Sequence, residues 1–190
     1  MSAGAISVRS VRDAIRVKRP LVIWQKIIWF PLHISKHSLI SWMALLDRLP
    51  TKDRLLRMVI NDCQCMFCDD PLETRDHLFL HCPMADYLWN SIFSLCGLQF
   101  RTRSWESFLA WACSSCKDKS LLTSIMKIAL NALIYIIWEE RNKKMFLGRS
   151  RNAQELLRAI KDIVGSQLRG RNLNSINSVN TNLCKHWDIV

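Results

Sequence analysis

The sequence predicts an all-α fold, an irregular helical domain built around a small Cys/His loop, with a long C-terminal helix. Apolar residues recur at helical spacing along most of the chain, whereas alternating strand patterns and Asn-Gly or Asp-Gly hairpin turns are absent. One short stretch, residues 61–83, breaks this pattern and concentrates Cys, His, Asp and Pro. We therefore expect helices that surround one irregular loop.

The composition is that of a globular chain with a strong basic excess. Its 190 residues are 49% hydrophobic, which is enough to bury a core and argues against disorder. The formal net charge of +11 makes an acidic partner, such as nucleic acid or an anionic membrane, electrostatically plausible. Eight cysteines are too few for a disulfide scaffold at this length, and no secretory signal is recognisable, so we expect reduced thiols.

The first half of the chain shows four helical segments. Apolar spacing predicts helices over residues 8–15, 21–30 and 38–49; the first ends before Pro20, and the other two end directly before Pro31 and Pro50. Thr51 is placed to cap a further short helix that extends to Met58.

The second half carries longer helical patterns. We expect helices over residues 84–96, 104–112 and 120–146; the first ends at Gly97, a residue type suited to a left-handed turn, and the last ends before Gly148. Asn152 with Glu155 three residues later is typical of a capping box, and it predicts the start of another helix.

These patterns divide the chain into three segments. Residues 1–100 contain the Cys/His loop, residues 101–170 form a helical extension, and residues 171–190 read as a flexible Asn-rich tail whose last apolar residues can dock back. Residues 121–138 approach the length of a membrane span. Lys127 and Asn131 would be costly in lipid, so we expect a buried helix and no membrane partner.

The Cys/His loop has the spacing of a metal site. Cys65, Cys68, His77 and Cys82 form the pattern C-x2-C-x8-H-x4-C. Four nitrogen and sulfur ligands favour a closed, tetrahedral, structural Zn²⁺ site, with no open position for a reacting water. The sequence therefore predicts a zinc-knuckle-like loop. The alternative is a small core of reduced thiols.

Other thiols and imidazoles compete less well as ligands. Cys63 lies too close to Cys65 for the usual pair, and His81 adjoins Cys82, so each is an alternative ligand at most. Cys113 and Cys116 form a second C-x2-C pair without further ligands nearby, which favours core thiols.

These residues resemble a known family, the zinc-binding domain that follows the reverse transcriptase in plant non-LTR (LINE-type) retrotransposons. The resemblance rests on Trp24–Trp29, Lys36–Leu55, the Cys65/Cys68 pair, Glu73–Pro83 and Leu88–Trp89, and continues more loosely through Trp138–Phe146. It implies a non-catalytic module that positions RNA or target DNA. It also suggests that Met1 starts a truncated or domesticated fragment of such a polyprotein.

One motif imitates a polymerase metal site and is set aside. Phe67, Cys68, Asp69 and Asp70 match the aromatic-x-Asp-Asp signature, but a polymerase needs a third carboxylate and a palm sheet, for which no strands are evident. We therefore expect both aspartates to be solvated turn residues and the protein not to be an enzyme.

The leading functional hypothesis is binding of RNA or DNA through the phosphate backbone, without base specificity. Residues 63–100 carry one basic and five acidic side chains, so the expected contacts lie outside the loop. They are Arg9, Arg12, Arg16, Lys18, Arg19, Arg101, Arg103, Arg141, Lys143 and Lys144.

A rival hypothesis is a protein-interaction module that docks on a host or element protein through the apolar face of residues 121–138. A third is a reading frame without a selected function. The expected location is nuclear or cytoplasmic, with mitochondrial import as the alternative, because the N-terminus is rich in arginine and poor in acidic residues.

Overall fold

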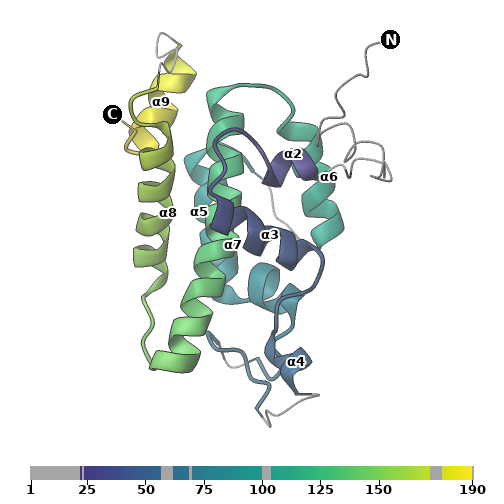
Figure 1. Ribbon diagram of the computed structural model, residues 1–190. Helices are drawn as coiled ribbons and strands as arrows, with labels where there is room; N and C mark the ends of the chain where they lie inside the picture. The colour runs from purple at the N-terminus through teal and green to yellow at the C-terminus, as the bar shows by residue number, and fades with distance from the viewer. Residues whose placement is uncertain are drawn as a thin grey trace, which may run out of the picture.

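The computed structural model describes residues 22, 24–56, 62–68, 70–99, 104–171 and 177–189. Within these ranges the protein is helical and contains no strand, which confirms the predicted all-α class. The predicted helix over residues 8–15 lies outside the described residues. Figure 1 shows the helices gathered around one long central helix, α7.

The N-terminal half of the described chain is built from short helices. They are α2 (Gln25–Ile28), α3 (Ser35–Leu45), α4 (Lys52–Leu55), the π-helical turn η1 (His77–His81) and α5 (Pro83–Leu95). Of the helix expected over residues 21–30, the structure shows only the four residues of α2. Gly97, with φ +67°, follows α5 in the left-handed conformation that the sequence predicted.

Helix α3 begins and ends earlier than the apolar pattern predicted over residues 38–49. Asp47 adopts a positive φ of 51°, and the backbone N–H groups of Asp47 and Arg48 donate to the carbonyls of Ala44 and Met43. These two bonds form a Schellman motif, in which an aspartate occupies the position usually taken by glycine. Leu49 is nevertheless buried, so its apolar character reflects the core and not a longer helix.

The second half contains α6 (Trp105–Ser115), α7 (Leu121–Leu147), α8 (Ala153–Leu168) and α9 (Ser178–His186). Ser104 and Asn152 close capping boxes at the starts of α6 and α8, and the second of these was predicted. Gly148, with φ +64°, ends α7. Helix α9 forms within the predicted Asn-rich tail, where no helix was expected, and Trp187 after it is fully buried, in line with the expected docking of the last apolar residues.

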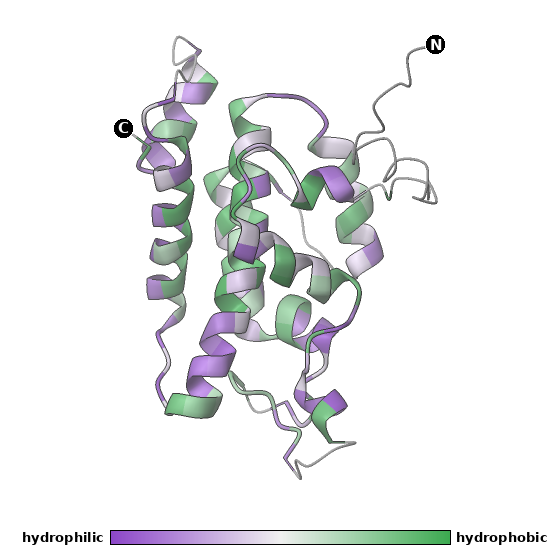
Figure 2. Ribbon diagram, in the orientation of Figure 1, coloured by the Kyte–Doolittle hydropathy of each residue, from purple (hydrophilic) through white to green (hydrophobic). Residues whose placement is uncertain are grey.

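Helix α7 supplies the centre of the core. It packs against α2, α3, α5, α8, α9 and η1, and its residues from Ile125 to Ile137 are mostly buried. It is long and apolar enough to cross a membrane, but 78% of its most apolar stretch is buried inside the protein, as in an ordinary core helix. Figure 2 shows its middle as hydrophobic and the turns that follow as hydrophilic, before a short hydrophobic end. Those last turns reach the level of α4 and the Cys/His loop (Figure 1).

Candidate metal centre

The four residues predicted as metal ligands lie together. The ligand atoms of Cys65, Cys68, His77 and Cys82 are all within 4.8 Å of one another. The Sγ atom of Cys82 lies 3.9 Å from the Sγ atoms of both Cys65 and Cys68, and Cys68 Sγ lies 3.2 Å from His77 Nε2. A tetrahedral Zn²⁺ with Zn–S bonds of about 2.3 Å separates its sulfurs by about 3.8 Å. The measured sulfur separations therefore fit one zinc ion.

The first two thiols are placed by a tight turn. The Cys65 N–H donates to the carbonyl of Asp70 at 2.9 Å, which closes the turn. The Phe67 N–H points at Cys65 Sγ, 3.4 Å away, and such a backbone donor favours the thiolate form of the sulfur. The short C-x2-C spacing thus gives two sulfurs on one side of a loop.

The other two ligands are brought together by the π-helical turn η1. The Cys82 N–H donates to the carbonyl of His77, five residues earlier, at 2.7 Å. An ordinary α-turn would pair residues four apart, so the wider turn accounts for the H-x4-C spacing. The hydroxyl of Thr74 accepts the His77 N–H at 3.0 Å and fixes the start of this turn. Cys82 then caps α5, where Pro83 begins the helix.

The protonation of the three thiols is strongly linked. A hydrogen bond from Cys82 lowers the pKa of Cys65 to about 5, whereas the same contact and burial raise the pKa of Cys82. Burial also raises the pKa of Cys68. Without a cation, one thiolate therefore forms readily and the next two do not. A divalent ion supplies the charge that lets all three ionise, so binding would release protons.

Asp70 takes a role that the sequence analysis missed. Its Oδ2 atom lies 3.4 Å from His77 Nδ1, on the ring edge opposite the nitrogen that faces Cys68. Metal-bound imidazoles commonly direct their second nitrogen to a carboxylate, which fixes the ring and its tautomer. Asp70 was expected to be a solvated turn residue. Its side chain is indeed 43% exposed, but it points at a candidate ligand.

The alternative ligands stand outside the cluster. Among the described residues, the only group whose ligand atoms converge is the predicted set, and it contains neither Cys63 nor His81. Cys113 and Cys116 lie at the end of α6 and are not part of it. Asp69 lies outside the described residues.

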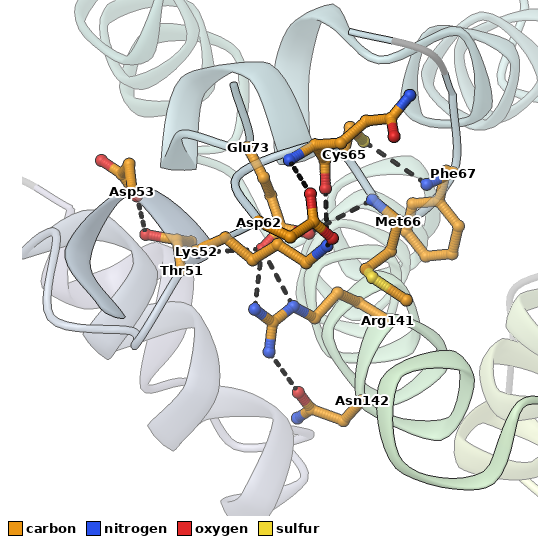
Figure 3. A network of polar contacts seen from close by, with 11 residues as sticks. Thr51, Lys52, Asp53, Asp62, Cys65, Met66, Phe67, Glu73, Arg141 and Asn142 are labelled. Carbon is orange, nitrogen blue, oxygen red and sulfur yellow. Dashed lines mark hydrogen bonds and ion pairs between the residues drawn. The ribbon is translucent and has the colours of Figure 1, made fainter. Parts of the chain in front are cut away.

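A buried ion pair, which no pattern in the sequence indicated, joins the Cys/His loop to α7. Figure 3 shows Glu73 at the centre of this network. Its Oε1 accepts from Arg141 Nε at 3.0 Å, from Arg141 Nη2 at 2.8 Å and from the Lys52 N–H at 3.1 Å. The side chains of Glu73 and Arg141 are 0% and 2% exposed. The pair therefore fixes the loop against both α4 and the central helix.

Lys52 makes further polar contacts between α4 and the loop. Its ammonium group donates to Asp62 Oδ2 and to the Gln64 carbonyl, both at 2.8 Å (Figure 3). Because Gln64 directly precedes Cys65, this contact fixes the backbone just before the first candidate ligand. Hydrogen bonds and ion pairs thus support the loop in addition to any metal ion that it binds.

The predicted phosphate contacts divide into three groups. The structure corrects one of them, because Arg141 is buried against Glu73 and cannot reach a ligand at the surface. Lys143 is 42% exposed and pairs with Glu139, and Lys144 is partly exposed on the last turn of α7. Arg9, Arg12, Arg16, Lys18, Arg19, Arg101 and Arg103 lie outside the described residues.

Comparison with known proteins gives one match. Residues 6–89 match a family model described as zinc-binding in reverse transcriptase. The matched segment contains all four clustered ligands and ends within α5. No curated protein and no solved structure matches the chain. The geometry and the match together support a zinc-binding module.

Proposed function

We propose that this zinc-binding module is derived from a plant retrotransposon polyprotein and binds RNA or DNA through the phosphate backbone, without a catalytic role. The observation that carries the zinc part is the convergence of Cys65, Cys68, His77 and Cys82 within the segment that matches the family. The nucleic-acid part is supported by the match to a reverse-transcriptase domain and by the net charge of +11.

The proposed role of zinc is structural. Three thiolates and one imidazole occupy all four coordination positions of a tetrahedral ion, which leaves none for a water or a substrate. Such an ion contributes on the order of 10 kcal/mol to the folding of small sites. It would hold together a loop of irregular backbone and keep α4 and α5 in their places beside α7.

A filter-binding titration tests the nucleic-acid role. Zinc-loaded protein is titrated against single-stranded RNA and duplex DNA at low and at physiological salt. We expect affinity to fall by at least about tenfold with salt, since each neutralised phosphate releases counterions. Unlabelled nucleic acids of scrambled sequence should displace the bound probe as well as the probe's own sequence does. An affinity that does not change with salt would remove this proposal.

The protein-docking alternative loses the observation that prompted it. The apolar face of residues 121–138 is buried in the core and is not available to a partner. Exposed apolar area remains at the end of α7, where Phe146 and Leu147 are 73% and 67% exposed. Self-association together with a lack of retention on heparin would favour this alternative over nucleic-acid binding.

A further inference from the structure

A cavity of about 510 Å³ lies between α2, the end of α6 and the first half of α7. It is separate from the metal centre. The described residues that line it are Val22, Gln25, Lys26, Ile27, Cys113, Cys116, Lys117 and Lys127. Three lysines thus line one cavity, Lys26 on α2, Lys117 just after α6 and Lys127 on α7.

These lysines have no carboxylate at ion-pair distance among the described residues, although Asp118 interacts electrostatically with Lys127. None of the described lining residues is acidic, and none of the three lysines forms an ion pair within the described part of the chain. Asp118, next to Lys117, is already used: its Oδ1 accepts hydrogen bonds from the backbone and hydroxyl of Ser120 and from the hydroxyl of Thr123 at the start of α7.

The two thiols of the cavity do not balance the charge either. Burial raises the pKa of Cys116 to about 11 and also raises the pKa of Cys113. Both are therefore neutral thiols at pH 7. Three lysines that line one cavity make it an electrostatically favourable place for an anion.

The donor set of the cavity fits a phosphate group, and its volume is more than one phosphate needs. Its volume lies within the range of about 300–1,000 Å³ found for ligand pockets. A lysine ammonium carries three donors and no acceptor, so these side chains suit oxyanions and not cations or neutral sugars. The rest of the chain also carries an excess of basic groups, which would attract a polyanion towards this cavity.

We propose that the cavity between α2, α6 and α7 is a phosphate-binding site in which Lys26, Lys117 and Lys127 hold a backbone phosphate of the bound nucleic acid. This inference rests on the proposed function for the identity of the ligand. The site itself rests on the three lysines and the cavity. It names contacts that the sequence pattern did not reveal, because Lys26 is far in the chain from Lys117 and Lys127 and joins them only in the fold.

The first experiment tests the site through Cys113, which is partly exposed in the cavity. Zinc-loaded protein is treated with N-ethylmaleimide, and the modification of each cysteine is followed by peptide mass spectrometry. We expect pyrophosphate and a single-stranded RNA oligonucleotide each to slow modification of Cys113 severalfold. Cys63, which is equally partly exposed but remote from the cavity lining, is the internal control and should react at an unchanged rate.

The second experiment compares two triple variants of equal charge. One carries K26Q, K117Q and K127Q. The other carries R158Q on α8, R169Q directly after it and K185Q on α9; α8 and α9 lie on the opposite side of the molecule from α2 and α6 (Figure 1). The first should lose at least about tenfold in RNA affinity, and its salt slope should fall by about two units. The second should lose less than about threefold. Circular dichroism and zinc content check that both variants fold.

The outcomes separate the inference from the function on which it rests. If RNA binds and both triple variants lose equal affinity, only overall charge matters and the site is overturned. If RNA does not bind the wild-type chain, the proposed function fails, and protection by pyrophosphate decides the site alone. Protection of Cys113 that disappears in the K26Q, K117Q and K127Q variant supports a phosphate site. An unchanged Cys113 rate with both ligands overturns it.

Discussion

Single residues determine how firmly the Cys/His loop is attached to the helical core. Glu73 is the clearest case, since its buried carboxylate accepts hydrogen bonds from α7 and from the backbone of α4. A buried charge of this kind is tolerated only while its partner remains. Arg141 therefore acts in the interior, although its place in a run of charged residues had suggested a surface contact.

Arg141→Met should destabilise the protein strongly. It leaves the Glu73 carboxylate buried without its partner, so we expect the free energy of unfolding in urea to fall by about 3–5 kcal/mol. Adding Glu73→Gln should restore part of this loss, because the amide carries no charge. Lys143→Met is the control, since the Lys143–Glu139 pair is exposed and worth at most about 1 kcal/mol. Equal losses in R141M and K143M would contradict the role of the buried pair.

His37 should make stability depend on pH. Its ring stacks on Tyr135 at a centroid distance of 4.2 Å and is 3% exposed, and burial together with Lys36 lowers its pKa from 6.5 to about 4. The unfolded chain therefore binds this proton more readily between pH 6.5 and 4. Stability from this group is complete above pH 6.5 and is lost as the pH falls towards 4.

Comparison with His37→Phe isolates this effect from the thiols, because the aromatic ring keeps the stack on Tyr135 and removes the titration. Urea unfolding is measured at a series of pH values. As the pH falls through this window, the free energy of unfolding of the wild type should fall relative to that of the variant. A difference that stays constant from pH 7 to pH 4 would show that His37 takes up its proton equally in both states.

At the scale of elements, local signals in the sequence were reliable where they follow from backbone chemistry. The capping box of Asn152 and Glu155 and the glycine after α5 lie where the sequence placed them. The end of α3 was not predictable in the same way, because Asp47 takes a left-handed conformation without being glycine. The π-helical turn was also hidden, since its spacing is visible only once His77 and Cys82 are known to converge.

Helix α9 was missed because its stabilisation is tertiary. Its nine residues include two Asn, one Ser and one Thr, which are poor helix formers, and the pattern alone indicated a tail. Trp187 is nevertheless fully buried just after it, and Lys161 of α8 pairs with Asp188 at 2.6 Å. Burial of one large side chain thus offsets a weak local preference.

Trp187→Ala should accordingly behave as a core mutation. We expect it to lower the free energy of unfolding by about 3–5 kcal/mol, since it removes a large buried ring and leaves a cavity. Val179→Ala on α9 itself is the matched control, because Val179 is 58% exposed, and its effect should stay below about 0.5 kcal/mol. Thermal or urea unfolding measures both. A W187A variant as stable as the wild type would show that residues 177–189 contribute little to the stability of the fold, as expected of a flexible tail.

At the scale of the whole molecule, one continuous core joins the segments that the sequence suggested dividing at residue 100. Helix α7, which lies beyond the matched residues 6–89, packs against α3, α5 and η1. The all-α class and the ligand spacing could be predicted, because both follow from local patterns. The Glu73–Arg141 pair and the lysine cavity could not, because they depend on which distant segments meet.

A fragment comprising residues 1–100 should therefore fold poorly on its own. It lacks α7 and so exposes the apolar faces of α3 and α5 and leaves Glu73 without Arg141. We expect reduced helix content by circular dichroism and no cooperative thermal transition, even with zinc added. A fragment that melts cooperatively would show that the matched segment is an independent domain.

The most direct test of the account is zinc K-edge X-ray absorption on the purified chain, with metal content measured on the same sample. We predict about one zinc per chain, bound by three sulfurs at about 2.3 Å and one nitrogen at about 2.0–2.1 Å. Cys65→Ser and Cys82→Ser should lose most of the metal, whereas Cys63→Ser, in the same loop but outside the cluster, should retain it. A chain without zinc, or zinc bound only by oxygen and nitrogen, would contradict the account.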